Sequence, residues 1–304
     1  MVGVRPVTAA VEGRSKVRSF LRLVMIEHSV FALPFAYIAA LTAMRTLGTH
    51  IDWLTLLVIT VAMVSARTVA MAANRIIDRR IDAQNPRTAK RELVTGALSL
   101  RTAYTGLGVS LVVFFASAAL LNWLCLALSP IALFFLIIYS YAKRFTDFPQ
   151  VFLGLAQAIA PLGAWIGVTG HWSWTAFALG LAVGAWIGGF DLMYACQDVD
   201  VDRRIGVRSV PVRFGVANAL RASVVTHVAT LALYATFGVL AGFGVIWWVG
   251  LAVTAVVLAY EHAIVRPTDL SRMNRAFFTA NGVVGIVLFV FAVADLVVLQ
   301  GLRP

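Results

Sequence analysis

The stretch LTLLVITVAMVSARTVAMAANRIIDRRIDAQNPR, residues 54–87, joins an apolar segment directly to a segment dense in charged side chains. Its last fourteen residues, 74–87, hold six charged side chains, although only 13% of the chain is charged and 61% is apolar. An apolar run of about 20 residues is what an α-helix needs to cross the core of a bilayer. The stretch therefore predicts a transmembrane helix whose polar end carries function.

Apolar runs of this kind recur along all 304 residues, and the mean hydropathy is +0.87. We predict an all-α, polytopic integral membrane protein in which residues 1–304 form a single membrane domain. The first apolar run is too long for the core of a signal peptide, so we expect it to be retained. The nine predicted transmembrane helices are 20–44, 54–74, 100–121, 123–142, 149–168, 173–196, 218–242, 245–265 and 274–299.

The net charge of +11 would suit a nucleic-acid-binding protein, but the positions of the charges indicate membrane topology instead. Of the 25 Lys and Arg residues, 22 fall in alternate loops that share one side of the membrane if the N-terminus is inside. The remaining three are Arg45, Arg67 and Arg303. Positively charged loops stay in the cytoplasm, so the pattern predicts an N-in, C-out protein of the cytoplasmic membrane and no nucleic-acid partner.

Two of the predicted inner loops, at about 75–99 and 197–217, are longer than a connection between neighbouring helices requires. They resemble each other, because one reads IDRRIDAQNPRT and the other DVDRRIGVRSVP, each with an Asp-Arg-Arg cluster behind a helix. We therefore predict two pseudo-equivalent Asp-rich loops and an active site that faces the cytoplasm.

Acidic residues in and before these loops follow helical spacing. Asn74, Asp78 and Asp82 are four residues apart and would form one stripe if the second helix continues past its apolar part, with Arg67 on the same stripe. In the sixth helix, a second stripe consists of Asp191, Asp198 and Asp202, with Tyr194 close by.

Five carboxylates on two stripes would repel one another unless cations lie between them. Carboxylate and amide oxygens are hard ligands that suit Mg²⁺, whose coordination is commonly completed by water and substrate phosphates. The arginines around both stripes can add bidentate contacts to phosphate. The pattern therefore predicts a Mg²⁺–diphosphate site for a lipid-soluble substrate.

Intramembrane acids also occur in secondary transporters, which form the alternative class. A transporter is expected to place its acids near the bilayer midplane. Here the acids lie at helix ends beside basic residues, which favours catalysis on a substrate dissolved in the membrane.

The sequence resembles the UbiA-type membrane prenyltransferases, in particular the 4-hydroxybenzoate polyprenyltransferase-like branch, which includes menaquinone enzymes of the futalosine route. The motifs that carry the resemblance are Asn74-Arg-Ile-Ile-Asp78-Arg-Arg-Ile-Asp82 and the Asp191 to Asp202 segment. Further family-like stretches are EHSVFALPFAY at 27–37, YSYAKRFT at 139–146 and IGVRSVPVRFG at 205–215. The resemblance implies a UbiA-like bundle of nine helices and Mg²⁺-dependent transfer of an isoprenoid chain from its diphosphate.

The resemblance also implies a role for each matching residue. Asn74, Asp78 and Asp82 would bind one Mg²⁺, and Asp198 and Asp202 another. Asp191 would lie close to the acceptor or the diphosphate. Contacts to the diphosphate would come from Arg67, Lys143 and Arg144, and Arg208 would help to close the site. The candidate catalytic residues are Asp78, Asp191, Asp198 and Arg67, and the candidate substrate-binding residues are Arg67, Lys143, Arg144, Tyr194 and Arg208.

The expected substrates are a polyprenyl diphosphate and a hydroxylated aromatic acid, either 4-hydroxybenzoate or 1,4-dihydroxy-6-naphthoate, for ubiquinone or menaquinone synthesis. The family also leaves open a different acceptor, such as haem, homogentisate, chlorophyllide or a glycerol phosphate. The reaction needs an apolar cavity that excludes water from an allylic cation. Candidate wall residues are Phe31, Phe35, Tyr37, Phe134, Phe135 and Trp186.

Overall fold

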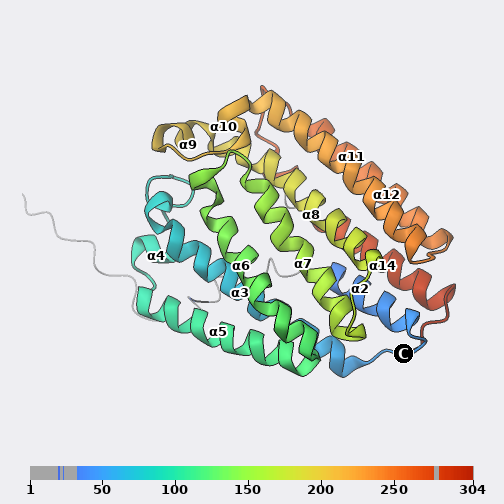
Figure 1. Ribbon diagram of the computed structural model, residues 1–304. Coiled ribbons are helices and arrows are strands. Elements are labelled where there is room, and N and C mark those ends of the chain that lie inside the picture. The colour runs from blue at the N-terminus through green and yellow to red at the C-terminus, as the bar shows by residue number, and fades with distance from the viewer. Residues whose placement is uncertain (1–19, 21–22, 24–32, 277–280, 304) are drawn as a thin grey trace, which may run out of the picture.

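The computed structural model describes residues 20, 23, 33–276 and 281–303, and these form an all-helical bundle (Figure 1). In Figure 1 the short helices α4, α9 and α10 lie at one end of the bundle, and the C-terminus lies at the other end. We call the end with α4, α9 and α10 the site end, and the end with the C-terminus the opposite end. The elements in chain order are α2 (Leu33–Thr46), α3 (Trp53–Asp82), α4 (Glu92–Thr95), α5 (Leu100–Leu121), α6 (Trp123–Phe145), α7 (Pro149–Thr169), α8 (Trp174–Tyr194), the 3₁₀-helix η2 (Ala195–Asp198), α9 (Val199–Ile205), α10 (Val210–Phe214), α11 (Val216–Leu240), α12 (Val245–Ile264), α13 (Met273–Arg275) and α14 (Asn281–Val298).

Eight of the predicted membrane spans are confirmed as helices long and apolar enough to cross a bilayer. They are α3, α5, α6, α7, the continuous segment Trp174–Ile205, α11, α12 and α14. The first predicted span, 20–44, coincides with α2 only in its second half, because residues 21–22 and 24–32 lie outside the described part of the chain. The same applies to the basic residues before position 20, to the candidate wall residue Phe31 and to positions 277–280 of the ninth span.

Polar residues at the helix starts explain where several spans begin. The side chains of Asp52, Ser99, Asn122 and Ser173 each accept a hydrogen bond from a backbone N–H in the first turn of α3, α5, α6 and α8, respectively. Such caps satisfy donors that the helix itself leaves unpaired. These four spans therefore begin where the sequence offers a short polar side chain.

Helices α7 and α8 approach each other closely because small residues line their contact. A Cβ atom added to Gly154 would lie 2.7 Å from the carbonyl oxygen of Gly184, and one added to Gly184 would lie 2.6 Å from the Gly154 oxygen. Small residues permit this kind of backbone approach between membrane helices. The contact fixes α8, which carries Asp191, against the middle of the bundle.

Large aromatic side chains fill the core between α2, α8, α11 and α12. Phe35, Trp186, Tyr234, Phe237 and Trp247 are all fully buried, and the Phe35 ring lies 5.1 Å from Trp186 and 5.9 Å from Tyr234. The core therefore includes two residues that we predicted as walls of a substrate cavity, Phe35 and Trp186.

Exposed tryptophans surround the opposite end of the bundle. Trp53, Trp123, Trp172, Trp174 and Trp248 lie at or just before the first turns of α3, α6, α8 and α12, and all are at least 38% exposed. Tryptophan concentrates where the hydrocarbon core meets the lipid headgroups. These side chains therefore mark one membrane boundary at the opposite end.

Candidate active site

The first acidic stripe lies on the last turns of α3, which continues well past its apolar part. The Asn74 Nδ2 donates to Asp78 Oδ2 at 2.9 Å and to Ser140 Oγ of α6 at 3.3 Å. Asp78 and Asp82 are 1% and 4% exposed. The predicted stripe of three residues therefore exists, and it faces the interior of the site end.

Cations from the last turn of α6 hold Asp78. The Lys143 Nζ lies 2.5 Å from Asp78 Oδ2, and the Arg144 Nη2 lies 3.0 Å from Asp78 Oδ1. Arg144 also donates to the backbone oxygens of Ser140 and Ile77. Lys143 and Arg144, both predicted to bind substrate, are thus brought to the first acidic stripe.

The chain folds back after α3 and returns a further cation to the stripe. The Arg91 Nη1 lies 2.5 Å from Asp82 Oδ1, and Thr88 Oγ1 donates to the backbone oxygen of Asp82 at 3.0 Å. Burying charged groups is tolerated when they are paired and hydrogen-bonded. The segment 83–91 therefore compensates the charge of Asp82 and fixes the end of α3.

The second acidic set differs from its prediction, because its helix is interrupted. Asp191 lies in the last turn of α8, Asp198 ends the 3₁₀-helix η2, and Asp202 lies in α9. The spacing of seven and eleven residues was read on a continuous α-helix, so the predicted straight stripe is wrong in its geometry. A 3₁₀-helix has 3.0 residues per turn instead of 3.6, so the side chains after Ala195 are rotated relative to the face that a continuous α-helix would give them.

Two residues that our sequence reasoning missed connect the two acidic sets. Arg87 forms a bidentate pair with Asp198, with Nη2–Oδ2 at 2.5 Å and Nε–Oδ1 at 3.0 Å. Asn85 Nδ2 also donates to Asp198 Oδ1 at 3.0 Å, and the Arg87 guanidinium lies 5.2 Å from the centre of the Tyr194 ring. The signal in the sequence was the polar tripeptide Asn85-Pro-Arg87, which directly follows the stripe.

Arg87 is a permanent cation in this position. Burial lowers its pKa, but the hydrogen bonds and the charge of Asp198 outweigh burial, so the pKa of Arg87 lies above its ordinary value. Its charge is available either to Asp198 or to another anion that enters the site.

The remaining acids of the second set lie within electrostatic range of the same cations. Lys143 and Arg87 both act on the charges of Asp191 and Asp202. Neither of their carboxylates has a hydrogen bond or ion pair with another described residue. The structure thus gathers both acidic sets around Lys143 and Arg87 at the site end.

Arg208 lies beside this group but contacts none of its acids. Its backbone N–H donates to the Lys143 oxygen at 3.0 Å, its Nη1 donates to the Phe145 oxygen at 2.8 Å, and its Nε lies 3.4 Å from Asp147 Oδ1. Arg208 therefore joins the segment after α9 to the end of α6, which carries Lys143.

An apolar cavity of about 410 Å³ lies next to the acids, between α3, α5, α6 and α7. It is lined along α6 from Cys125 to Tyr139, a distance of about 21 Å at 1.5 Å per residue. Tyr139 lies within electrostatic range of Asp78, Asp191 and Arg67. This tyrosine therefore marks the junction between the cavity and the acidic site.

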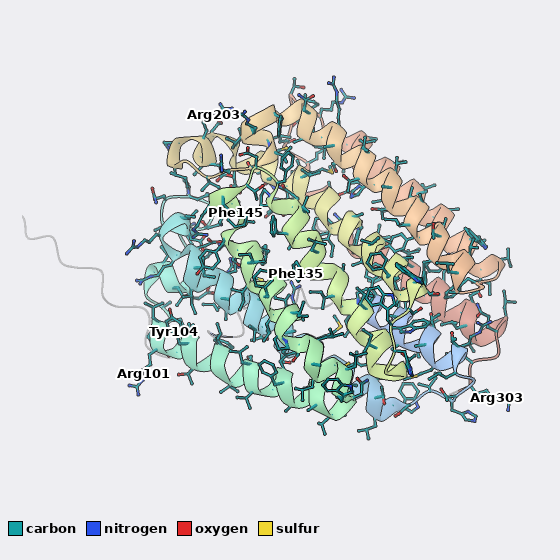
Figure 2. All side chains as sticks on the ribbon, viewed as in Figure 1. Arg101, Tyr104, Phe135, Phe145, Arg203 and Arg303 are labelled. Carbon is teal, nitrogen blue, oxygen red and sulfur yellow. The ribbon has the colours of Figure 1, made fainter. Side chains whose placement is uncertain are left out.

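Of the predicted wall residues within the described chain, Phe135 lines this cavity and Phe35, Tyr37, Phe134 and Trp186 do not. Figure 2 shows Phe135 in the middle of the bundle, well away from Arg203 at the site end and Arg303 at the opposite end. Phe134 is 59% exposed on the outside of α6. Aromatic character alone did not predict which helix face a side chain would occupy.

Arg67 is the cation of the cavity. It lines the cavity wall, and its buried Nε has no hydrogen-bond partner among the residues that the structure describes. No described acid forms an ion pair with it. An unpaired guanidinium among apolar side chains is costly, so Arg67 is suited to receive an anionic group of a ligand.

The donor set fits Mg²⁺ held jointly by protein and substrate. In the described part of the chain, no three His, Cys, Asp or Glu side chains gather closely enough to enclose a metal ion. Mg²⁺ does not require such a cage, because one or two carboxylates with water and substrate phosphates are its usual ligands. The Asn74 amide nitrogen donates to Asp78, so the Asn74 amide oxygen remains as a further hard ligand for the metal.

Comparison with known proteins relates this arrangement to a family of membrane enzymes. The profile of the UbiA prenyltransferase family matches residues 32–283. The 4-hydroxybenzoate octaprenyltransferase of Xanthomonas euvesicatoria pv. vesicatoria (strain 85-10) is 36% identical over 236 residues, which cover 78% of each chain. That of Alkalilimnicola ehrlichii (strain ATCC BAA-1101 / DSM 17681 / MLHE-1) is 34% identical over 236 residues, 78% of this chain and 80% of that one.

Solved structures share the fold. The apo structure of a UbiA homologue from Aeropyrum pernix K1 has a TM-score of 0.79 and 36% identity, and the match covers 89% of this chain and 98% of that chain. A UbiA homologue from Archaeoglobus fulgidus bound to DMAPP and Mg²⁺ has a TM-score of 0.70 at 19% identity, with 92% and 99% covered.

Proposed function

Because the chain belongs to the UbiA prenyltransferase family, we propose that it transfers a polyprenyl chain from polyprenyl diphosphate to 4-hydroxybenzoate. One observation carries the proposal, namely that Arg87, from the segment that follows the first acidic set, pairs with Asp198 of the second set beside an apolar cavity that contains an arginine with no ion pair among the described residues. The acids and their cations suit a diphosphate, the cavity suits an isoprenoid chain, and Arg67 suits a carboxylate.

The acids provide the metal ligands. Asn74, Asp78 and Asp82 would hold one Mg²⁺, and Asp198 and Asp202 would hold another. When bound, Mg²⁺ would neutralise charge on the diphosphate as it departs. The Mg²⁺ and DMAPP bound to the Archaeoglobus fulgidus homologue, which has the same fold, are consistent with this assignment.

The cations around the acids can exchange partners. Lys143, Arg87 and Arg91 each pair with one carboxylate of the site. Each has a long side chain that is 24–39% exposed, so a small rotation can transfer it to a phosphate oxygen. These side chains would then stabilise the negative charge that develops on the leaving group, a form of electrostatic help that often dominates catalysis.

The reaction breaks the bond between the allylic carbon and the diphosphate oxygen, and the electron pair leaves with the diphosphate. The ring carbon ortho to the hydroxyl then attacks the allylic cation, and the ring loses a proton. Asp191 has no hydrogen-bond partner among the described residues and lies near Tyr139 at the cavity junction, so we assign it to the ring proton. The apolar cavity walls keep water from the cation.

We assign Arg67 to the carboxylate of the acceptor. Our sequence analysis predicted a contact to the diphosphate instead, and both assignments are testable. Arg67 lies seven residues before Asn74, which is about 10 Å deeper along α3. At that depth it can fix one end of a small aromatic acid while the ring faces the allylic carbon near Tyr139.

Kinetics of Arg67→Leu distinguish these assignments. If Arg67 binds the acceptor, the KM for 4-hydroxybenzoate should rise at least tenfold while the KM for the donor stays constant. The variant should also lose its preference for 4-hydroxybenzoate over a phenol that lacks the carboxylate. A rise in the donor KM alone would assign Arg67 to the diphosphate.

The acceptor 1,4-dihydroxy-6-naphthoate is the second candidate, because it too presents a carboxylate to Arg67 and a hydroxylated ring to the allylic carbon. The curated relatives favour 4-hydroxybenzoate, since they are named 4-hydroxybenzoate octaprenyltransferases. Haem, homogentisate, chlorophyllide and glycerol phosphate have no comparable support. The transporter alternative is set aside, because the chain is a prenyltransferase by family.

We place the protein in the cytoplasmic membrane with its site end inside. The distribution of Lys and Arg supports this orientation, because the exposed arginines of α9, α10 and the segment after α12 lie at the site end. They are Arg203, Arg204, Arg213, Arg266 and Arg272.

The deciding experiment incubates purified protein in lipid with Mg²⁺, octaprenyl diphosphate and each acceptor separately. Mass spectrometry should detect octaprenyl-4-hydroxybenzoate, and chelation of Mg²⁺ should stop its formation. A product with 1,4-dihydroxy-6-naphthoate alone would assign the second candidate. Absence of any prenylated acid with an active donor would overturn the proposed acceptor class.

A further inference from the structure

A polar network outside the active site crosses the C-terminal half of the bundle. The Trp186 Nε1 of α8 donates to Asn281 Oδ1 of α14 at 2.9 Å, and Asn281 Nδ2 donates to Glu261 Oε1 of α12 at 2.9 Å. His227 of α11 lies 2.9 Å from His262 of α12 and 3.9 Å from Glu261. The reaction uses none of these side chains.

Hydrogen bonding assigns the protons of the two histidines. The His227 Nε2 lies 3.2 Å from the backbone oxygen of Trp186 and must donate, because a carbonyl oxygen can only accept. In the neutral ring His227 Nδ1 then accepts, so His262 Nε2 is the donor of the 2.9 Å contact. His262 therefore keeps Nδ1 as the nitrogen without a described partner.

His262 also lines a groove of about 220 Å³ at the site end, between the end of α8, the start of α11 and the end of α12. The groove has two polar residues, His262 and Arg221, and its remaining lining is apolar. The other lining residues are Met193, Ala217, Leu220, Val224, Val265 and Pro267.

Within the described part of the chain, no acidic side chain lines this groove. Arg221 is exposed, and its described partner is the neutral Asn218, at 3.2 Å. Glu261 lies behind His262 and is engaged with Asn281. The groove thus presents a positive charge and an imidazole nitrogen with no negative charge beside them.

The position of the groove indicates the kind of anion. It lies where two membrane-spanning helices end, and both helices carry exposed apolar side chains along their spans. On α11 these include Val225 and Val228, which are 69% and 62% exposed, and on α12 Val256, which is 69% exposed. An acyl chain could lie along this surface while its headgroup remains at the membrane boundary.

We propose that this groove binds a phospholipid with an anionic, hydroxyl-bearing headgroup, whose phosphate contacts Arg221, whose hydroxyl donates to His262 Nδ1 and whose acyl chain follows α11 and α12. Basic pockets between membrane helices are suited to anionic headgroups. The apolar lining favours a lipid over a soluble phosphate, because a free anion gains nothing from Leu220 or Val224. The network behind His262 fixes the imidazole so that the lone pair of Nδ1 is left to accept from a headgroup hydroxyl, such as those of phosphatidylglycerol.

The test measures lipid retention by the full chain in detergent, using native mass spectrometry. Phosphatidylglycerol should remain bound, and phosphatidylcholine should be retained at least fivefold less. Arg221→Gln should reduce phosphatidylglycerol binding at least fivefold, and Val224→Trp should do the same by filling the groove without changing charge. Arg101→Gln is the matched control, because Arg101 is an exposed arginine at the start of another span, α5. This variant should retain phosphatidylglycerol as well as the wild type does.

Three outcomes would overturn the proposal. One is equal phosphatidylglycerol retention by wild type and both groove variants. Another is equal retention of phosphatidylcholine and phosphatidylglycerol by wild type. The third is thermal stabilisation by glycerol phosphate or inorganic phosphate equal to that by phosphatidylglycerol, which would indicate a soluble-anion site. Prenyl transfer is a separate readout, so failure here leaves the proposed function untouched.

Discussion

The carboxylates at the two ends of the bundle have different kinds of partner. At the opposite end, Asp52 and Asp295 accept hydrogen bonds from backbone N–H groups at the starts of α3 and α12. At the site end, Asp78, Asp82 and Asp198 pair with Lys and Arg side chains. A backbone N–H is fixed by its helix, whereas a long cationic side chain can turn to another anion. The first pair of acids thus serves the fold, and the second group can serve a reaction.

The largest effect is expected for Asp78→Ala and Asp198→Ala, measured as prenyl transfer by purified protein. Each should lower kcat roughly 1,000-fold or more, because removing a group that stabilises developing charge costs 10²–10³ or above in comparable cases. The folded variants should remain extractable from membranes. Wild-type rates in both variants would show that these acids are not the metal and diphosphate site.

The same two variants should differ in stability. Asp78→Ala leaves Lys143 and Arg144 partly buried without a counterion, since their side chains are 24% and 35% exposed, which we expect to cost about 1–2 kcal/mol. Asp198→Ala frees the more exposed Arg87 and should cost below about 1 kcal/mol. In detergent, Asp78→Ala should therefore unfold at a lower temperature than Asp198→Ala.

This contrast also shows how far the sequence predicts the molecule. Apolar runs of membrane length predicted nine spans, and the described part of the chain confirms eight of them, because crossing a bilayer imposes both length and composition. Helical periodicity placed Asn74, Asp78 and Asp82 on one face, because α3 is an uninterrupted helix there. The break at η2 had no such signal, since Ala195-Cys-Gln-Asp198 contains neither Gly nor Pro.

Local sequence patterns did not predict contacts between segments that are distant in the chain. Arg87 and Asp198 are 111 residues apart and meet only because the segment after α3 folds back over the site end. His227 and His262 likewise pair across two helices without any His motif in the sequence. Phe35 and Trp186 were predicted as cavity walls, but the packing of α2 and α8 places them in the core.

Asp295→Ala tests the role of a carboxylate at the opposite end of the bundle. We expect it to have the second-largest effect. The buried carboxylate accepts from Gly244 N at 2.9 Å, Trp247 N at 3.0 Å and Gln300 Nε2 at 2.7 Å. Its loss leaves the start of α12 uncapped, so we expect a stability loss of about 3 kcal/mol in thermal unfolding. The kcat of the remaining folded protein should be unchanged. Asp295→Asn should lose less stability, because its amide oxygen can still accept a hydrogen bond. A lower kcat in either variant would contradict a purely structural role for Asp295.

Arg87→Gln tests whether the cations at the site end serve substrate. The KM for the diphosphate donor should rise about tenfold, equivalent to about 1.4 kcal/mol, because a bidentate contact to phosphate is lost. Arg87→Lys should recover little, since an ammonium group lacks the planar fork. Arg80→Gln is the control, because Arg80 is an exposed arginine near the end of α3, seven residues before Arg87. An unchanged donor KM in Arg87→Gln, with lower stability, would make Arg87 a fold residue like Asp295.

The smallest effect is expected for Asp52→Ala, which removes an exposed cap at the start of α3. Asp52 accepts a hydrogen bond from the Thr55 hydroxyl at 2.7 Å and another from the Thr55 backbone N–H at 3.0 Å. Loss of such a cap costs about 1 kcal/mol.

The hydrogen bond from the Thr55 hydroxyl, and then the one from the Thr55 backbone, hold the pKa of Asp52 below its ordinary value of 3.8. The stability difference between wild type and Asp52→Ala should therefore be constant at neutral pH. It should shrink as the pH falls below the ordinary pKa and through the lower folded one, because the protonated carboxyl keeps a capping oxygen but loses the charge. Asp52→Asn keeps a capping oxygen without the charge, so its stability relative to Asp52→Ala should not change over that range. A pH-independent difference between wild type and Asp52→Ala would mean that the charge at this helix start contributes nothing.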